Sequence, residues 1–191
     1  MERFLDLEEK MLCSKQLFEG RILHVYDDTV RLPNGQTASR ELIRHVGAVC
    51  VIPVFENGDV LMERQYRYPV GEVILEIPAG KLNCKEEDHL QAAKRELREE
   101  TGCIAGSWLS LGTFYPACAY SDEAIELFLA RDLSFEAQKL DADEFLNVER
   151  IALKELVLQV MRGEIPDAKT QIAVLKAEKY LQVSEAEKTI P

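Results

Sequence analysis

The chain has 191 residues, 47% of them hydrophobic and 30% charged, which is enough apolar material for one folded domain with an appendage or a compact pair of modules. Its 34 acidic and 23 basic side chains give a net charge of -11, which repels nucleic-acid backbones and anionic membranes. Nucleic-acid and membrane partners are therefore disfavoured, whereas an anionic phosphate substrate can bind where a divalent cation and a few arginines reverse the local field.

The start of the chain and its cysteines indicate a cytoplasmic protein. The first ten residues, MERFLDLEEK, are acidic where a secretion signal needs a basic flank and an apolar run. The longest apolar stretch, residues 46–55, contains Gly47 and Pro53 and falls short of the roughly 20 residues of a membrane helix. The five cysteines are odd in number and form no C-x-x-C pair, as expected for reduced thiols.

Strand signals follow an acidic N-terminal segment. Residues 20–32 carry β-branched and aromatic side chains, residues 33–35 (Pro-Asn-Gly) supply a turn, and residues 39–45 resume an extended pattern. This pattern predicts a β-hairpin, and we assign residues 1–45 to an N-terminal hairpin subdomain.

Three further strands are expected before the first helix. Residues 46–55 form one, and residues 60–66 are expected to pair back on it after an Asn-Gly turn. A short strand over residues 73–77 ends at Pro78-Ala79-Gly80.

The second half of the chain mixes helices and strands. Residues 88–101 have the helical period, with Leu90, Ala93 and Leu97 on one stripe and Gly102 as the C-terminal stop. Strands are then expected over 108–114, 124–130 and 145–151, and helices over 152–161 and 168–181. The fold class is therefore α+β, with residues 184–191 predicted as a disordered polar tail.

The helix over residues 88–101 carries paired carboxylates. On a helical wheel Glu96 and Glu100 lie one turn apart beside the apolar stripe. Like charges at this spacing destabilise a helix, more so when partly desolvated, so they call for a neutralising partner. Magnesium, which prefers carboxylate oxygens, is one such partner. The alternative is a solvated face with an Arg95–Glu99 surface ion pair.

Residues 80–103, G-KLNCKEEDHLQAAK-RELREETGC, resemble the Nudix box. Its second half matches from Arg95 through Cys103. One extra residue separates Gly80 from Arg95, so Glu86 satisfies one spacing of the box and Glu87 the other. We interpret this as a loop insertion, with Glu87 the better match.

The resemblance implies a metal site and a fold. Glu96 and Glu100 would be the principal ligands of Mg²⁺, with Mn²⁺ as a substitute, Glu99 a further ligand and the Ala79 carbonyl a backbone ligand. Arg95 would orient Glu99. The implied fold is a Nudix-type α/β/α sandwich around a mixed sheet, formed by residues 46–183.

The likeness extends to the ADP-ribose pyrophosphatase branch of the family. The matching segments are residues 40–41 with 45–48, 64–67, 75–80 and 163–170. The branch implies magnesium-dependent cleavage of ADP-ribose to AMP and ribose 5-phosphate. It also implies a homodimer that exchanges contacts through the N-terminal hairpin, with sites between the chains.

Four residues are candidates for binding the substrate. Arg67 is assigned to the phosphates because a guanidinium presents a planar fork of donors to phosphate oxygens, and Arg40 is the second candidate. Glu41 and Glu76 are candidates for the nucleoside. The alternative is structural: the arginines in surface ion pairs, and the two glutamates paired with Arg40 or Arg64.

The reaction also needs a base that takes a proton from the attacking water. Residues 141–145, Asp-Ala-Asp-Glu-Phe, are expected to form the loop that supplies it, with Glu144 as the base and Asp143 as the alternative. Glu99 and Glu100 complete the catalytic carboxylates. A plain solvated loop, with metal-bound hydroxide acting alone, is the other possibility.

The substrate itself stays open between related compounds. Members of the ADP-ribose branch carry a proline fifteen residues past the box, where this chain has Cys118, and Pro116 comes two residues early. GDP-mannose or ADP-glucose are therefore alternative substrates. A non-catalytic nucleotide-sugar sensor is a further alternative, disfavoured because Glu96, Glu99 and Glu100 are all retained.

Overall fold

The computed structural model describes residues 5–140, 142 and 144–188, and these form two compact units. The first comprises residues 5–47 together with Tyr115–Ala124, and the second comprises Ala48–Phe114 with residues from Ile125 onward. The sequence analysis drew its boundary after residue 45 and left residues 115–124 in the hydrolase domain. The first unit thus includes a segment from the middle of the chain that local patterns do not assign to it.

The first unit is a three-stranded antiparallel sheet in the order β1-β2-β3. Its strands are β1 (Lys10–Glu19), β2 (His24–Arg31) and β3 (Thr37–Ile43), preceded by a 3-10 turn over Leu5–Leu7. The expected hairpin is β2-β3, turning at Gly35 with φ 82°. β1 was not predicted because its apolar residues stand next to one another, at positions 11–13 and 17–18, and give no alternation; all ten residues of the strand are exposed.

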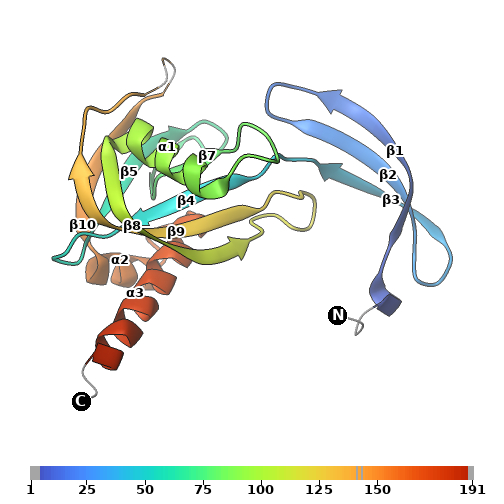
Figure 1. Ribbon diagram of the computed structural model, residues 1–191. Helices are drawn as coiled ribbons and strands as arrows, with labels where there is room; N and C mark the ends of the chain where they lie inside the picture. The colour runs from blue at the N-terminus through green and yellow to red at the C-terminus, as the bar shows by residue number, and fades with distance from the viewer. Residues whose placement is uncertain (1–4, 141, 143, 189–191) are drawn as a thin grey trace. The chain divides into compact units, whose positions relative to one another are not determined.

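The second unit contains two sheets and three helices (Figure 1). A mixed sheet has the order β7-β4-β9-β8, with β4 parallel to β9, and an antiparallel sheet has the order β10-β5-β6. The strands are β4 (Ala48–Pro53), β5 (Asp59–Arg67), β6 (Glu72–Glu76), β7 (Ala79–Lys81), β8 (Cys103–Phe114), β9 (Ile125–Phe135) and β10 (Leu146–Ala152). The helices are α1 (His89–Thr101), α2 (Leu153–Met161) and α3 (Ala168–Lys188).

The expected pairing of residues 60–66 with 46–55 is wrong. β4 and β5 belong to different sheets, and the pairing among the described residues is limited to an isolated bridge between Val54, just after β4, and Val60 of β5. Every residue of β4 is buried, so this strand needs a neighbour on each edge, and β7 and β9 take those places. A short tight turn between two apolar runs is therefore not enough to make them a hairpin.

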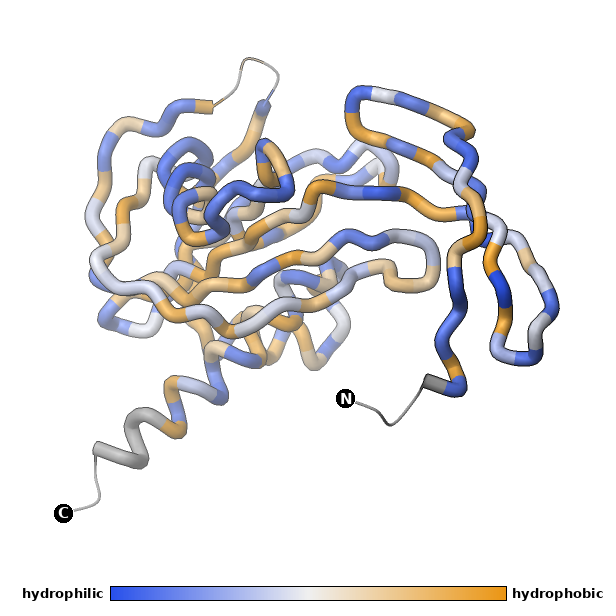
Figure 2. The backbone as a smooth tube through the Cα atoms, turned by 45° about the vertical axis from the view of Figure 1, so that its right-hand side comes forward, coloured by the Kyte–Doolittle hydropathy of each residue, from blue (hydrophilic) through white to orange (hydrophobic). Residues whose placement is uncertain are grey.

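The second unit is an α/β/α sandwich. Ala48, Cys50 and Ile52 of β4 pack in one core with α2 and α3, while the alternate residues Val49 and Val51 face the α1 side. Figure 1 shows α1 on one side of the sheets and α2 and α3 on the other. Figure 2 shows hydrophobic runs along the middle strands and a mostly hydrophilic α1.

The last helix is longer than expected. α3 continues through Lys188, so residues 184–188 of the expected disordered tail are helical, and residues 189–191 lie outside the described part of the chain. Residues 181–188 contain two weak helix formers, Val183 and Ser184, and no Gly or Pro, so the α3 helix can continue. No helix among the described residues is long and apolar enough to span a membrane.

Candidate active site

Helix α1 has well-defined ends. The Asp88 carboxylate accepts a hydrogen bond from the Gln91 amide at 2.9 Å, which caps the N-terminus. Gly102 closes the other end with φ 68°, its amide bonded to the Arg98 carbonyl. The expected helix and its glycine stop are confirmed. The buried face is shifted slightly from the expected stripe, because Ala92 is buried and Leu90 is only half-buried.

Glu100 is a carboxylate on the buried face of α1. It is only 5% exposed, and its Oε2 accepts a hydrogen bond from the Ala79 amide at 3.0 Å. Burial raises the pKa of Glu100 well above its usual value, and the nearby charges of Glu63, Glu96 and Glu144 raise it further. Three other carboxylates thus act on Glu100 from α1, β5 and the loop before β10.

Glu63 on β5 is the buried neighbour of Glu100. It is 3% exposed, and its Oε1 has no hydrogen-bond partner among the described residues. Burial, Glu76 and Glu144 all raise the pKa of Glu63. A buried carboxylate oxygen without a partner costs free energy, so the charged form of Glu63 is disfavoured although Arg67 and Lys169 act on it in the opposite direction.

Glu96 lies beside Gly80 of β7. Burial raises the pKa of Glu96, and the Glu144 charge acts in the same direction, while Arg95 opposes it. A Cβ atom added at Gly80 would overlap the Glu96 carboxylate, so only glycine leaves room for this side chain. Gly80, the first residue of the box-like segment, therefore leaves the space that the Glu96 side chain of α1 occupies.

The carboxylates suit a divalent cation. Glu96 turns to Arg95 and Glu100 to the Ala79 amide, and no three described His, Cys, Asp or Glu side chains close around a common point. The charges of Glu63, Glu96 and Glu144 nevertheless raise the pKa of Glu100, and the Glu144 charge also raises the pKa values of Glu63 and Glu96, as crowded anions do. A hard cation with oxygen ligands would neutralise this cluster, and the donor set matches that preference.

Arg95 connects the helix to the loop before it. Its guanidinium bonds Glu96 at 2.5 Å, Glu87 at 3.3 Å and Glu99 at 3.4 Å. Glu87 also accepts hydrogen bonds from the backbone and side chain of Asn83, whereas Glu86 is exposed. Glu87 is thus the early glutamate that reaches Arg95, in keeping with the spacing counted back from that residue.

Arg67 and Glu76 form one ion pair, not two separate contacts. Arg67 donates from Nε and Nη2 to the Glu76 carboxylate at 2.7 and 2.9 Å. Lys169 of α3 also binds Glu76 and lies 3.0 Å from Asp167. Burial disfavours the Glu76 charge, but these cationic partners outweigh it and lower the pKa of Glu76.

The chain's sequence matches two families. Residues 44–172 match the NUDIX domain, and residues 9–43 match the nucleoside diphosphate sugar hydrolase N-terminal domain. The chain belongs to the Nudix hydrolase family.

Individual relatives agree with this assignment. The chain is 41% identical over 182 residues to a protein of Bacillus subtilis (strain 168) named ADP-ribose pyrophosphatase, covering 94% of this chain and 96% of that protein. It is 43% identical over 183 residues to a Bacillus methanolicus protein named methanol dehydrogenase activator, covering 94% and 95%. A crystal structure titled ADP compounds hydrolase has a TM-score of 0.82 over 93% of this chain and 97% of that one, at 22% identity, which confirms the expected fold.

The structure brings together some of the expected Nudix site residues and leaves others elsewhere. Glu96, Glu100 and Ala79 meet at α1 and β7, and Glu99 lies at their edge with its side chain 34% exposed. Glu144 acts electrostatically on this cluster, while Asp143 falls outside the described residues.

The two candidates on β3 belong to the first unit. Arg40 pairs there with Glu9, at 2.5 Å between Nη2 and Oε1, and Glu41 is exposed. The alternative ion pairs weighed for Glu76 are wrong, because its partners are Arg67 and Lys169, and Arg64 pairs with Glu149.

The sequence analysis missed two residues of the site, Glu63 and Lys169. Glu63 directly follows the apolar run Val60-Leu61-Met62 of a strand, and a carboxylate at the end of a buried run was the signal that could have identified it. Lys169 stood in a segment that matched the ADP-ribose branch but had no role, because only the fold brings it to Glu76.

Proposed function

We propose that this Nudix chain hydrolyses the pyrophosphate of ADP-ribose to AMP and ribose 5-phosphate, using Mg²⁺ or, as a substitute, Mn²⁺. The observation that carries the proposal is the crowding of Glu96 and Glu100 of the Nudix helix with the buried Glu63 of β5, which gathers carboxylate oxygens of the kind that a divalent cation prefers. The similarity to an ADP-ribose pyrophosphatase along nearly the whole chain supports the choice of substrate.

The metal would be held by Glu96, Glu100 and the Ala79 carbonyl, with Glu99 at the edge of the site. When bound, it supplies Lewis-acid polarisation of the diphosphate and neutralises charge that develops on it. Glu63 keeps its unpaired Oε1 beside Glu100 and adds a further negative oxygen to the cation's surroundings. These residues explain why a multiply charged anion can bind a protein with an excess of acidic side chains.

The remaining residues act on the diphosphate and on water. Arg67 is fixed at Nε and Nη2 by Glu76, so it presents its remaining Nη1 edge to phosphate oxygens in one orientation. Glu144 accepts the proton of the attacking water at its carboxylate, as the water oxygen bonds to phosphorus and the bridging P–O bond breaks. Arg40 and Glu41 are proposed to contact substrate as side chains of the N-terminal sheet.

We propose that the protein is a cytoplasmic homodimer. β1 exposes apolar side chains that water solvates poorly: Met11 is 60% exposed, Phe18 55% and Leu17 49%. A second copy of the same sheet would cover them in an isologous contact. The match of residues 9–43 to a domain of nucleoside diphosphate sugar hydrolases supports a role for this unit in such an enzyme.

A second candidate is the same reaction on another nucleotide sugar, such as ADP-glucose or GDP-mannose. It is favoured by Cys118, which stands where the ADP-ribose branch has proline and lies exposed in Tyr115–Ala124. A cysteine there leaves the backbone of this segment less constrained than a proline would.

The deciding experiment is a substrate panel with identified products. ADP-ribose, ADP-glucose and GDP-mannose are incubated with the enzyme and Mg²⁺, with and without a chelator. We expect AMP and ribose 5-phosphate from ADP-ribose, and no product once the metal is chelated. Efficient cleavage of another nucleotide sugar, with ADP-ribose intact, would reassign the substrate.

Variants at α1 separate an enzyme from a sensor. Glu100→Gln should lower kcat by about 100-fold or more because it removes a ligand charge, and circular dichroism should show a retained fold. Glu56→Gln, at an exposed carboxylate in the β4–β5 turn, is the matched control and should leave turnover unchanged. If the wild-type chain binds nucleotide sugars but cleaves none of them, it is a sensor.

A further inference from the structure

Helix α1 carries opposite charges on its two flanks. Lys94 and Arg98 lie about 160° around the helix from Glu96 and Glu100, at 100° per residue. The acidic flank faces β7 and β5, as the contacts of Glu96 and Glu100 show. The basic flank therefore faces a different surface from the proposed metal site.

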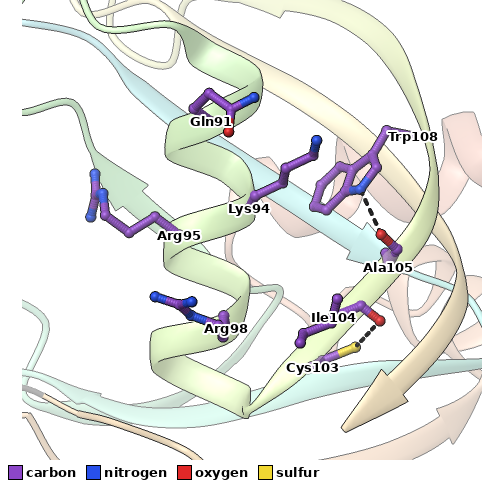
Figure 3. Close-up of a pocket in the computed structure, with 8 residues that line it drawn as sticks. All are labelled: Gln91, Lys94, Arg95, Arg98, Cys103, Ile104, Ala105 and Trp108. Atoms are coloured by element: carbon purple, nitrogen blue, oxygen red, sulfur yellow. Dashed lines mark hydrogen bonds between the residues drawn. The ribbon is translucent and has the colours of Figure 1, made fainter. Parts of the chain in front are cut away.

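A pocket of about 400 Å³ lies along this basic flank (Figure 3). It runs between α1 and the start of β8, and its size is within the range of small-ligand pockets. Its lining comprises Gln91, Lys94, Arg95, Arg98, Cys103, Ile104, Ala105 and Trp108.

Trp108 forms a fixed aromatic wall of the pocket. Its indole Nε1 donates to the Ala105 carbonyl at 3.0 Å, and its ring forms a T-shaped contact with Phe128, with 6.3 Å between the centroids. These two contacts fix the ring where it lines the pocket, as an aromatic surface on which a planar group can stack. Figure 3 shows Lys94 extending from α1 toward this indole.

Three cationic side chains line the pocket, and one of them, Arg95, is neutralised by Glu87, Glu96 and Glu99, but the other two are not. Lys94 and Arg98 are exposed, and neither forms an ion pair within the described part of the chain. Two such cations beside an aromatic face attract a planar anion.

We propose that this pocket is an accessory binding site for a nucleoside monophosphate. The base stacks on Trp108, and Lys94 and Arg98 bind the phosphate. Gln91, at the end of the pocket, offers one amide donor and acceptor to the base edge. The phosphate and base contacts of this site lie on the other flank of α1 from Glu96 and Glu100, with Arg95 as the residue that the two sites share, and the site does not depend on the proposed reaction.

The pocket holds the only tryptophan of the chain, so fluorescence reports on it directly. AMP is titrated into the full-length protein in the presence of a chelator, which removes metal from the proposed catalytic site at Glu96 and Glu100. We expect saturable quenching of Trp108. The double variant Lys94→Ala/Arg98→Ala should weaken AMP binding by about tenfold or more, since it removes both charged phosphate contacts.

Two controls identify where AMP binds. Lys154→Ala/Lys179→Ala removes the same charge from exposed positions of α2 and α3, and should leave the AMP affinity unchanged. Arg67→Ala removes the arginine proposed to bind the substrate phosphates at the catalytic site, and should also leave the quenching of Trp108 unchanged. Quenching that survives in Lys94→Ala/Arg98→Ala but is lost in Arg67→Ala would overturn the proposal.

Competition with inorganic phosphate tests whether both the base and the phosphate of AMP contribute to binding. Inorganic phosphate should displace AMP only at much higher concentration, because it cannot stack on the indole. Equal affinity for phosphate and AMP would mean that the pocket binds only the anion, and would overturn the claim that the nucleoside stacks on Trp108. The absence of any saturable quenching by AMP would overturn the proposal as a whole.

Discussion

Glu63 and Glu100 make the stability of the metal-free protein depend on pH. Both pKa values are raised, first by burial and then by neighbouring carboxylates, so the folded chain holds protons that an unfolded glutamate, with a pKa of about 4.3, releases. Their contribution to stability is fully present below that unfolded value. It is lost as the pH rises toward the raised folded values, because the unfolded state then binds fewer protons.

We therefore expect the melting temperature of the chelated wild-type protein to fall between about pH 5 and pH 8 more steeply than that of Glu100→Gln. Mg²⁺ replaces protons at the same oxygens, so its stabilising effect should grow over that range. Thermal unfolding at several pH values, with chelator or Mg²⁺, measures both effects. Parallel curves for Glu100→Gln and wild type would show that this carboxyl is not buried as described.

Gly80 and Gly58 show two different requirements for glycine. At Gly80 the requirement is space, since a Cβ there would overlap the Glu96 carboxylate. At Gly58 it is backbone conformation, since φ is +86° and nothing lies within 4 Å of an added Cβ.

Gly80→Ala should therefore displace Glu96 and lower kcat by about 100-fold with little loss of stability, because a small misplacement at a reacting centre is costly. Gly58→Ala should lose about 1 kcal/mol of stability through strain and keep its activity. Steady-state kinetics and urea unfolding of both variants measure the contrast. Normal turnover in Gly80→Ala would mean that Glu96 has another productive position.

At the scale of elements, one threonine joins α3 to the end of β6. Thr170 is fully buried, and its hydroxyl accepts a hydrogen bond from the Ile77 amide at 3.0 Å and donates to Asp167 at 2.6 Å. The same segment carries Lys169, which binds Glu76. The start of α3 thus fixes the end of β6, where Glu76 binds Arg67.

Thr170→Val keeps the volume but leaves the Ile77 amide buried without an acceptor, which should cost about 1 to 3 kcal/mol. Thr170→Ser keeps the hydroxyl and should lose no more than about 1 kcal/mol for the missing methyl. Hydrogen exchange at the Ile77 amide separates the two variants, because only the valine should accelerate it strongly. Equal exchange in both would show that the amide has a different partner.

Local patterns predicted elements whose signals lie within a few residues. The ends of α1 were predicted because Asp88 and Gly102 cap it through bonds to residues three or four positions away. The pairing of β4 with β9 and the contact of Lys169 with Glu76 were not predicted, because each joins residues far apart in the chain. Glu63 was missed for the same reason: its role depends on Glu100, which comes from another element.

At the scale of the whole molecule, the cysteines report on folding and association together. Cys50 and Cys103 are buried, and burial raises the pKa of Cys50 to about 12 and that of Cys103 to about 11. Thiolate is the reactive form, so both should resist a thiol reagent until the second unit opens. Cys84 and Cys118 are exposed and should react promptly.

Cys13 differs because it lies on β1, beside the exposed apolar side chains that the proposed dimer would cover. At low protein concentration, where the monomer dominates, it should react as fast as Cys84, and at high concentration dimerisation should slow it. Titration with Ellman's reagent at a series of concentrations, with Cys13→Ser to identify its share, measures this change beside light scattering. If the reactivity of Cys13 stays constant while the mass doubles, the chain associates through a surface other than β1.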